Sequence, residues 1–257
     1  GLVGSEMCIR DSTYIGMLGG TDPAAKVLFA THLLSASVMA VPGSIVLAKM
    51  LCPQTEEATD HVAISGKEKE NSNILDAISS GTVTGVKLMT NIAAMLLVFI
   101  SLVALANYIT EGVIGRYTGL NDWIVKITDG KAQGLTFQFI LGVITSPFMW
   151  LIGVPSQDIM LVGSLLGQKT ILNEFVAYFQ LQQWKDAGLF MYEKSILMST
   201  YILCGFANIS SIGILLGGLG VLAPEKRGLI SRIGVPAMIG GALVSVLSAT
   251  IIGMILG

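Results

Sequence analysis

Long apolar runs, separated by short polar segments, dominate the chain. Four of the five runs that lack Asp, Glu, Lys and Arg over at least 22 positions are 27–48, 88–110, 195–224 and 233–257. A helix that crosses a bilayer needs about 20 such residues. The pattern therefore predicts an all-α integral membrane protein with spanning helices in these four ranges.

The apolar stretch 159–183 is long enough to span a bilayer, but it carries Lys169 and Glu174 in its middle. Non-helical backbone at such depth is tolerated only where it is buried in protein or lines a cavity. We therefore predict a re-entrant helical hairpin that enters the membrane, turns near Asn173 and leaves again. The stretch 133–153 contains proline and tryptophan, a composition that favours an interfacial or broken helix.

Small and polar residues interrupt the run 195–224. Glycine weakens a helix by roughly 1 kcal/mol relative to alanine, and Asn and Ser side chains compete for backbone hydrogen bonds. The pattern predicts a discontinuous helix with an unwound centre. Tight helix packing through the GxxxG spacing of Gly213 and Gly217 explains the same composition equally well. The interrupting residues are Gly205, Asn208, Ser210, Ser211 and Gly213.

Polar segments set the predicted domain boundaries. Residues 1–12, GLVGSEMCIRDS, have no helical period and resemble a translated sequencing-adapter run. We treat them as non-native, exclude them from the fold and expect the natural protein to continue upstream.

Basic residues in the short segment 223–232 favour the cytoplasmic side. The remaining divisions are transmembrane helices over 13–52, a cytoplasmic loop over 53–81, a long scaffold transmembrane helix over 82–112, a loop and interfacial helix over 113–155, the re-entrant hairpin over 156–186, the discontinuous helix over 193–223 and the last transmembrane helix over 228–257.

Glu174 is the first candidate for contact with a polar solute. Ionisable groups inside a membrane are costly and are usually functional. Broken helices at the midplane expose half-helix N-termini and carbonyls that bind a solute and a coupling ion. A local role is the alternative: Asn173 caps the second half-helix, and Glu174 interacts with the helix dipole in its first turn. Both roles can hold together. Lys169, five positions away, is expected to pair across the tip or with another segment.

Composition narrows the classes of function. Only 12% of the 257 residues are charged and the mean hydropathy is +0.73, whereas soluble domains carry about 25% charged residues. The chain has no basic run and no aromatic-basic interleaving, so no nucleic-acid partner is expected. An intramembrane enzyme needs several acid–base or metal-binding groups at depth, and only Glu174, Lys169 and His32 qualify. A structural membrane subunit without transport activity is the other alternative.

Three stretches together resemble the C-terminal half of the concentrative nucleoside transporter family. They are HLLSASVMAVPGSIVLAKMLCPQTEE at 32–57, GSLLGQKTILNEFVAY at 163–178 and YILCGFANISSIGILLGGLGVLAPEKR at 201–227, and the resemblance extends over residues 13–257. It implies an elevator-type transporter half that belongs to a trimeric symporter of the bacterial inner membrane. Such proteins import nucleosides with a sodium or proton gradient.

The resemblance also implies the binding residues. Glu174 would contact the ribose hydroxyls, while Phe206, Asn208 and Ser211 would contact base and ribose. Neither catalytic residues nor metal ligands nor a cofactor are implied in this chain. The supporting residues would be Asn173, Ser210 and Gly205.

Part of the family's pattern is absent from this sequence. The first hairpin and the sodium ligands of the family would lie upstream of residue 13, so sodium and proton coupling both stay open for the full-length protein. The present chain alone is expected not to transport. The range 82–112 is the expected trimer contact.

Overall fold

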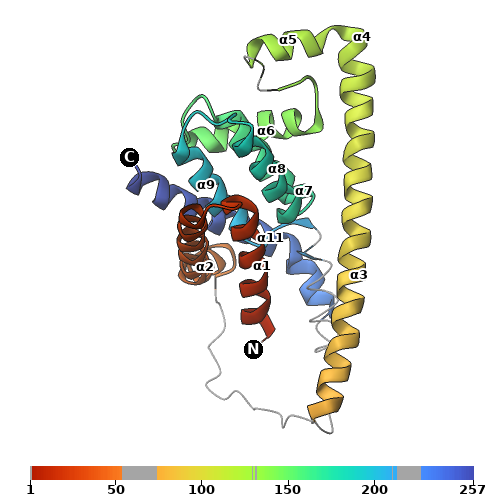
Figure 1. Ribbon diagram of the computed structural model, residues 1–257, viewed down its shortest axis with the longest axis vertical. Helices are drawn as coiled ribbons and strands as arrows, with labels where there is room; N and C mark the ends of the chain where they lie inside the picture. Colours follow the sequence, from red (N-terminus) through yellow and green to blue (C-terminus); the bar gives the residue numbers. More distant parts are fainter. Residues whose placement is uncertain (1, 54–73, 129, 131, 210, 213–226) are drawn as a thin grey trace.

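The computed structural model describes residues 2–53, 74–128, 130, 132–209, 211–212 and 227–257, and every regular element within these ranges is helical. Figure 1 shows a bundle of helices with one long helix beside it. In chain order the elements are α1 (Leu2–Gly19), α2 (Pro23–Leu51), α3 (Ile74–Asn107), the π-helix η1 (Tyr108–Gly115), α4 (Arg116–Thr118), α5 (Leu120–Ile127), α6 (Phe137–Leu151), α7 (Ile159–Ile171), α8 (Glu174–Asp186), α9 (Glu193–Cys204) and α11 (Arg227–Ile255).

The short helix α9 forms the centre of the bundle. It packs against α2, α7, α8 and α11 (Figure 1). A helix that is surrounded on all sides has no polar stripe, which explains why this stretch has the composition of a spanning helix. Its buried residues are Ser195, Met198, Ser199, Thr200, Tyr201, Ile202, Leu203 and Cys204.

Helices α6 and α7 approach each other closely because glycines line their contact. A Cβ atom on Gly142 would lie 2.8 Å from the carbonyl oxygen of Met160, and one on Gly163 would lie 2.6 Å from Thr145 Oγ1. Small residues allow such close approach of helices in membranes. Despite Pro147, α6 runs unbroken from its first residue to its last, so this stretch differs from a broken helix.

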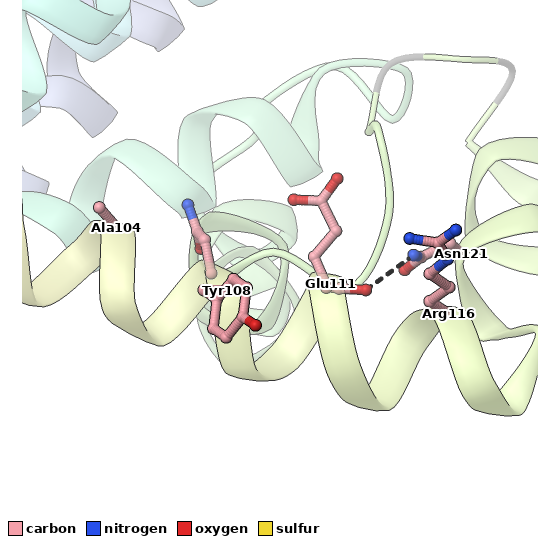
Figure 2. A pocket seen from close by; sticks show the side chains of 7 residues that line it. Ala104, Tyr108, Glu111, Arg116 and Asn121 are labelled. Carbon is pink, nitrogen blue, oxygen red and sulfur yellow. Dashed lines mark hydrogen bonds between the residues drawn. The ribbon is translucent and has the colours of Figure 1, made fainter.

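The long helix α3 lies beside the bundle and is joined to it through its C-terminal end (Figure 1). There Asn107 Oδ1 accepts a hydrogen bond from the backbone N–H of Phe137 at 2.7 Å. One turn after Asn107, the carbonyl oxygen of Glu111 accepts a hydrogen bond from Asn121 Nδ2 at 3.0 Å, as Figure 2 shows. The π-helix η1 begins directly after Asn107, contains Glu111 and lines part of an open cavity of about 390 Å³. Asn107 thus fixes the start of α6 to the long helix. Asn121, whose Oδ1 accepts from the N–H of Leu135 at 2.9 Å, fixes the loop before α6 to η1.

Two helices among the described residues are long and apolar enough to cross a membrane by length and composition, Pro23–Leu51 and Gly228–Ile255. The first contains the predicted range 27–48, and the second covers residues 233–255 of the predicted range 233–257. The predicted range 88–110 lies in α3 and η1, whereas the second part of the range 195–224 lies outside the described residues.

The helix boundaries differ from the sequence expectations in two places. Helix α1 begins at Leu2, although the first twelve residues were expected to lie outside the fold. Helix α3 begins at Ile74, within the range 53–81 that was expected to form a loop. Hydropathy marks where a helix enters lipid and not where it begins in water, so it does not locate the start of α3, whose first turns contain Asp76, Ser79 and Ser80. The proposed origin of residues 1–12 stays a prediction.

Candidate functional site

The tip of the hairpin between α7 and α8 places Glu174 in the interior. Helix α7 ends at Ile171, the backbone of Asn173 is extended, and Asn173 Oδ1 accepts a hydrogen bond from the N–H of Val176 at 2.9 Å. Such an N-cap satisfies one of the free N–H groups at the start of a helix. Glu174 is therefore the first residue of α8, and only 5% of its surface is exposed. The chain turns at the position that the sequence predicts.

A second break in regular structure lies opposite this tip. Helix α9 ends at Cys204, Gly205 is extended with φ −74° and ψ 135°, and helical residues resume at Ile209. A Cβ atom on Gly205 would lie 1.9 Å from Ser245 Oγ of α11. Only glycine fits at this point. Gly205 is therefore required by the close packing of α11 as well as by the break in the helix.

Asn208 and Ser211 bind each other across the start of the resumed helix. The N–H of Ser211 donates to Asn208 Oδ1 at 2.7 Å, and the N–H of Asn208 donates to Ser211 Oγ at 3.3 Å. This reciprocal arrangement has the form of a capping box. Both side chains are buried. The unwound centre predicted from the small and polar residues is thus a short extended segment followed by a capped helical turn.

The hairpin tip and the broken helix meet at one hydrogen bond. Asn208 Nδ2 donates to Glu174 Oε2 at 2.6 Å. The structure therefore brings Glu174, Asn208 and Ser211 together, and each comes from the first turn of a helical segment. Phe206 lies two residues before Asn208 and keeps 46% of its surface exposed, so its ring is accessible to a ligand. Ser210 lies outside the described residues.

Lys169 bonds to another chain segment, the second of the two pairings expected for it. Its ammonium donates to the carbonyl oxygen of Ile202 at 2.7 Å and to Ser245 Oγ at 3.0 Å. Sequence reasoning missed both partners. The only signal was the two serines within the apolar run 233–257, Ser245 and Ser248, and nothing local indicates which helix either of them contacts.

The arrangement suits recognition of a neutral polar solute. A carboxylate accepts hydrogen bonds through two oxygens, an amide both donates and accepts, and an aromatic ring offers an apolar face. Of the other ionisable side chains in the apolar runs, His32 has its Nδ1 3.1 Å from the hydroxyl of Tyr201. Among the residues that the structure describes, no three His, Cys, Asp or Glu side chains lie close enough together to hold a metal ion.

Comparison with known proteins gives a consistent result. A family model described as "Na+ dependent nucleoside transporter C-terminus" matches residues 32–253. An uncharacterized transporter of Haemophilus influenzae is 37% identical over 259 residues, which is 100% of this chain and 58% of that protein. The nucleoside permease NupC of Helicobacter pylori is 36% identical over 254 residues, which is 98% of this chain and 57% of that protein.

A solved structure shares the fold. CNTnw in an inward-facing substrate-bound state matches with a TM-score of 0.74 at 35% identity, over 94% of this chain and 56% of that one. The chain thus spans less than two thirds of the proteins that it matches. These proteins are named transporters and permeases, not enzymes.

Proposed function

The chain belongs to the family of Na+-dependent nucleoside transporters, and we propose that it is the C-terminal part of a symporter that carries nucleosides into the cell. The single observation that carries this proposal is the contact between Glu174 and Asn208, because it joins the hairpin tip to the broken helix. Broken helices that meet at the midplane form the solute site in many secondary transporters.

In the proposed site the two oxygens of Glu174 accept hydrogen bonds from the ribose hydroxyls. Asn208 and Ser211 add polar contacts, and Phe206 stacks on the base. A buried carboxylate suits a neutral diol because each hydroxyl donates one hydrogen bond to a charged acceptor, and such bonds contribute about 1.5–3 kcal/mol each. Asn173 and Gly205 support the site through the cap and the close approach described above, and Ser210 is assigned the same supporting part.

The protein is a membrane protein of a transporter family, and we place it in the bacterial inner membrane. The driving force is a cation gradient, either sodium or proton, and the sodium dependence of the family favours sodium. No separate cofactor is required.

We further propose a homotrimer with α3 as the contact between protomers. Eight of its described apolar side chains are exposed by more than half, among them Leu97, Val98, Leu102 and Leu105. Light scattering on the full-length transporter in detergent should give the mass of three protomers. A mass of one protomer would contradict this assembly.

Substitution of Glu174 by Gln tests the function directly. The change keeps the size of the side chain and removes the charge that strengthens its hydrogen bonds. In proteoliposomes that contain the full-length transporter, with a sodium gradient imposed, we expect uridine uptake to fall at least about tenfold. Chromatography of the accumulated solute should return unchanged uridine, as expected of a transporter and not of an enzyme.

Glu193 provides the matched control. It is also a glutamate at the first position of a helix, α9, but its side chain is exposed at the outer end of that helix. Glu193→Gln should leave uptake unchanged. Equal uptake by Glu174→Gln and the unsubstituted transporter would refute the proposed site and favour a structural membrane subunit.

A further inference from the structure

Lys169 is a fully buried cation in the last turn of α7, and its exposed surface is 0%. Its side chain leaves the hairpin and reaches two other helices, α9 through the carbonyl of Ile202 and α11 through Ser245. Burial of an ammonium is costly unless hydrogen bonds and opposite charge compensate it. Such a group inside a membrane domain calls for a function.

The end of α9 supplies the compensation. The last four carbonyl groups of a helix have no intrahelical partner, and they carry the negative end of the helix dipole. Since α9 ends at Cys204, the carbonyl of Ile202 is one of these four. The ammonium provides both a hydrogen bond and a positive charge where the helix lacks them.

Carbonyl oxygens at the C-terminal end of a half-helix, together with nearby hydroxyls, are also the groups that coordinate a coupling cation in broken-helix transporters. Here a side chain of the protein occupies that position. Lys169 thus contributes a cation that is covalently attached to the hairpin and is present whatever the ion concentration.

The same lysine lies beside the residue at which the helix breaks. A Cβ atom on Gly205 would lie 3.4 Å from Lys169 Nζ and 1.9 Å from Ser245 Oγ. Asn208, whose side-chain amide donates to Glu174, is only three positions after Gly205 in the chain. The position at which the chain leaves α9 therefore sets the position of Asn208.

We propose that Lys169 is a positioning residue for nucleoside binding: it acts as a built-in cation that holds the C-terminal end of α9 and so aligns Asn208 with Glu174. This inference rests on the proposed function of the site. Lys169 acts through the backbone of α9 and makes no contact with the solute. Its loss should therefore impair recognition of the sugar hydroxyls more than it impairs recognition of the base.

The test compares uridine with 3′-deoxyuridine, which lacks one sugar hydroxyl. In the full-length transporter in proteoliposomes, the ratio of the KM for 3′-deoxyuridine to the KM for uridine measures recognition of that hydroxyl. Lys169→Met keeps the length of the side chain and removes the charge. We expect it to lower this ratio by about fivefold, the value of one ordinary hydrogen bond. Reduced folding alone would lower the maximal rate and leave the ratio unchanged.

Lys185→Met is the matched control. Lys185 Nζ donates to the carbonyl of Leu18 at 2.6 Å, so it too binds a carbonyl near the end of a helix, but that helix is α1. The ratio should stay at the value of the unsubstituted transporter in this variant. An unchanged ratio in Lys169→Met, or an equal fall in both lysine variants, would overturn the inference.

Two further variants keep the result interpretable. If Lys169→Met does not fold, Ser245→Ala takes its place, because it retains the lysine and removes one of its two acceptors. A lowered ratio then supports the inference and an unchanged ratio overturns it. Glu174→Gln separates this inference from the proposed function: if it leaves both the ratio and uptake unchanged, the function itself fails, whatever Lys169 does.

Discussion

Asn208 donates its side-chain amide to Glu174 Oε2 at 2.6 Å, and this bond joins the first turns of two helical segments. Asn173 caps one of these segments and Asn208 caps the other. The positive end of the α8 dipole therefore lies at this carboxylate and stabilises negative charge there. One asparagine thus serves two purposes, as the cap of its own helix and as the partner of Glu174.

Substitutions of Asn208 can separate these two purposes. Asn208→Asp retains an oxygen that caps Ser211 N, but it places a second carboxylate against Glu174. Asn208→Ser retains a capping oxygen and removes the long amide. We expect both variants to fold, because serine and aspartate are good N-caps. Uridine uptake should fall severely in Asn208→Asp, because like charges repel strongly where they are buried. It should fall moderately in Asn208→Ser.

The measurement is the KM for uridine in proteoliposomes, with folding monitored by gel filtration in detergent. Adding Glu174→Gln to Asn208→Asp removes the repulsion and should lower the KM below that of Asn208→Asp alone, though not to the value of the unsubstituted transporter. Equal KM values for the aspartate and serine variants would contradict a direct contact between the two side chains.

Gly205→Ala tests the close approach between the break and α11. The added Cβ would lie 1.9 Å from Ser245 Oγ, so one of the two segments must shift. Overpacking of this kind costs about 1–3 kcal/mol, and we expect a lower thermal unfolding midpoint of the detergent-solubilised transporter. Ser245 Cβ would still lie 3.3 Å from the new atom. The double variant Gly205→Ala/Ser245→Ala should therefore recover only part of the lost thermal midpoint. A midpoint no higher than that of Gly205→Ala alone would show that Ser245 Oγ is not the atom that the added Cβ displaces.

Local signals explain which parts of this site the sequence predicts. Asn173 beside Glu174 marks the turn of the hairpin, and the glycine of CGFANISS marks the break, because caps and helix breakers act within a few residues. The partners of Lys169 lie 33 and 76 positions away along the chain. Such contacts are set by how helices pack, and no local pattern encodes them. Similarly, Phe206 is recognisable as part of a motif, while its exposure becomes visible only in the fold.

Asn107 fixes the long helix α3 to the start of α6. Its Oδ1 accepts from Phe137 N at 2.7 Å, and its Nδ2 donates to Gln138 Oε1 at 3.2 Å. Asn107→Leu keeps a similar size and leaves that N–H without its partner, which costs about 1–3 kcal/mol where the group is shielded from water. We expect a lower thermal midpoint, whereas Asn107→Asp retains the acceptor and should lose much less. Equal midpoints for the leucine variant and the unsubstituted transporter would show that the bond does not hold the two helices.

Asp158 closes the open end of the hairpin. The carboxylate is fully buried, and its Oδ1 accepts from Met191 N at 3.0 Å while its Oδ2 accepts from Tyr192 N at 3.1 Å. It therefore ties the start of α7 to the segment before α9. Because hydrogen bonds to a charged acceptor are strong, Asp158→Ala should cost about 3 kcal/mol and lower the thermal midpoint of the transporter. Asp158→Asn keeps one acceptor oxygen, so its thermal midpoint should lie between those of Asp158→Ala and the unsubstituted transporter.

Asp186→Ala is the control for this prediction, because Asp186 is exposed in the last turn of α8. It should leave the midpoint unchanged.

The position of Asp158, at the opposite end of α7 from Lys169, leads to a further expectation. Any Asp158→Ala protein that remains folded should keep the uridine to 3′-deoxyuridine discrimination of the unsubstituted transporter, since the hairpin tip is still held by Lys169. Loss of that discrimination would mean that the base of the hairpin, and not its tip, determines the geometry of the site.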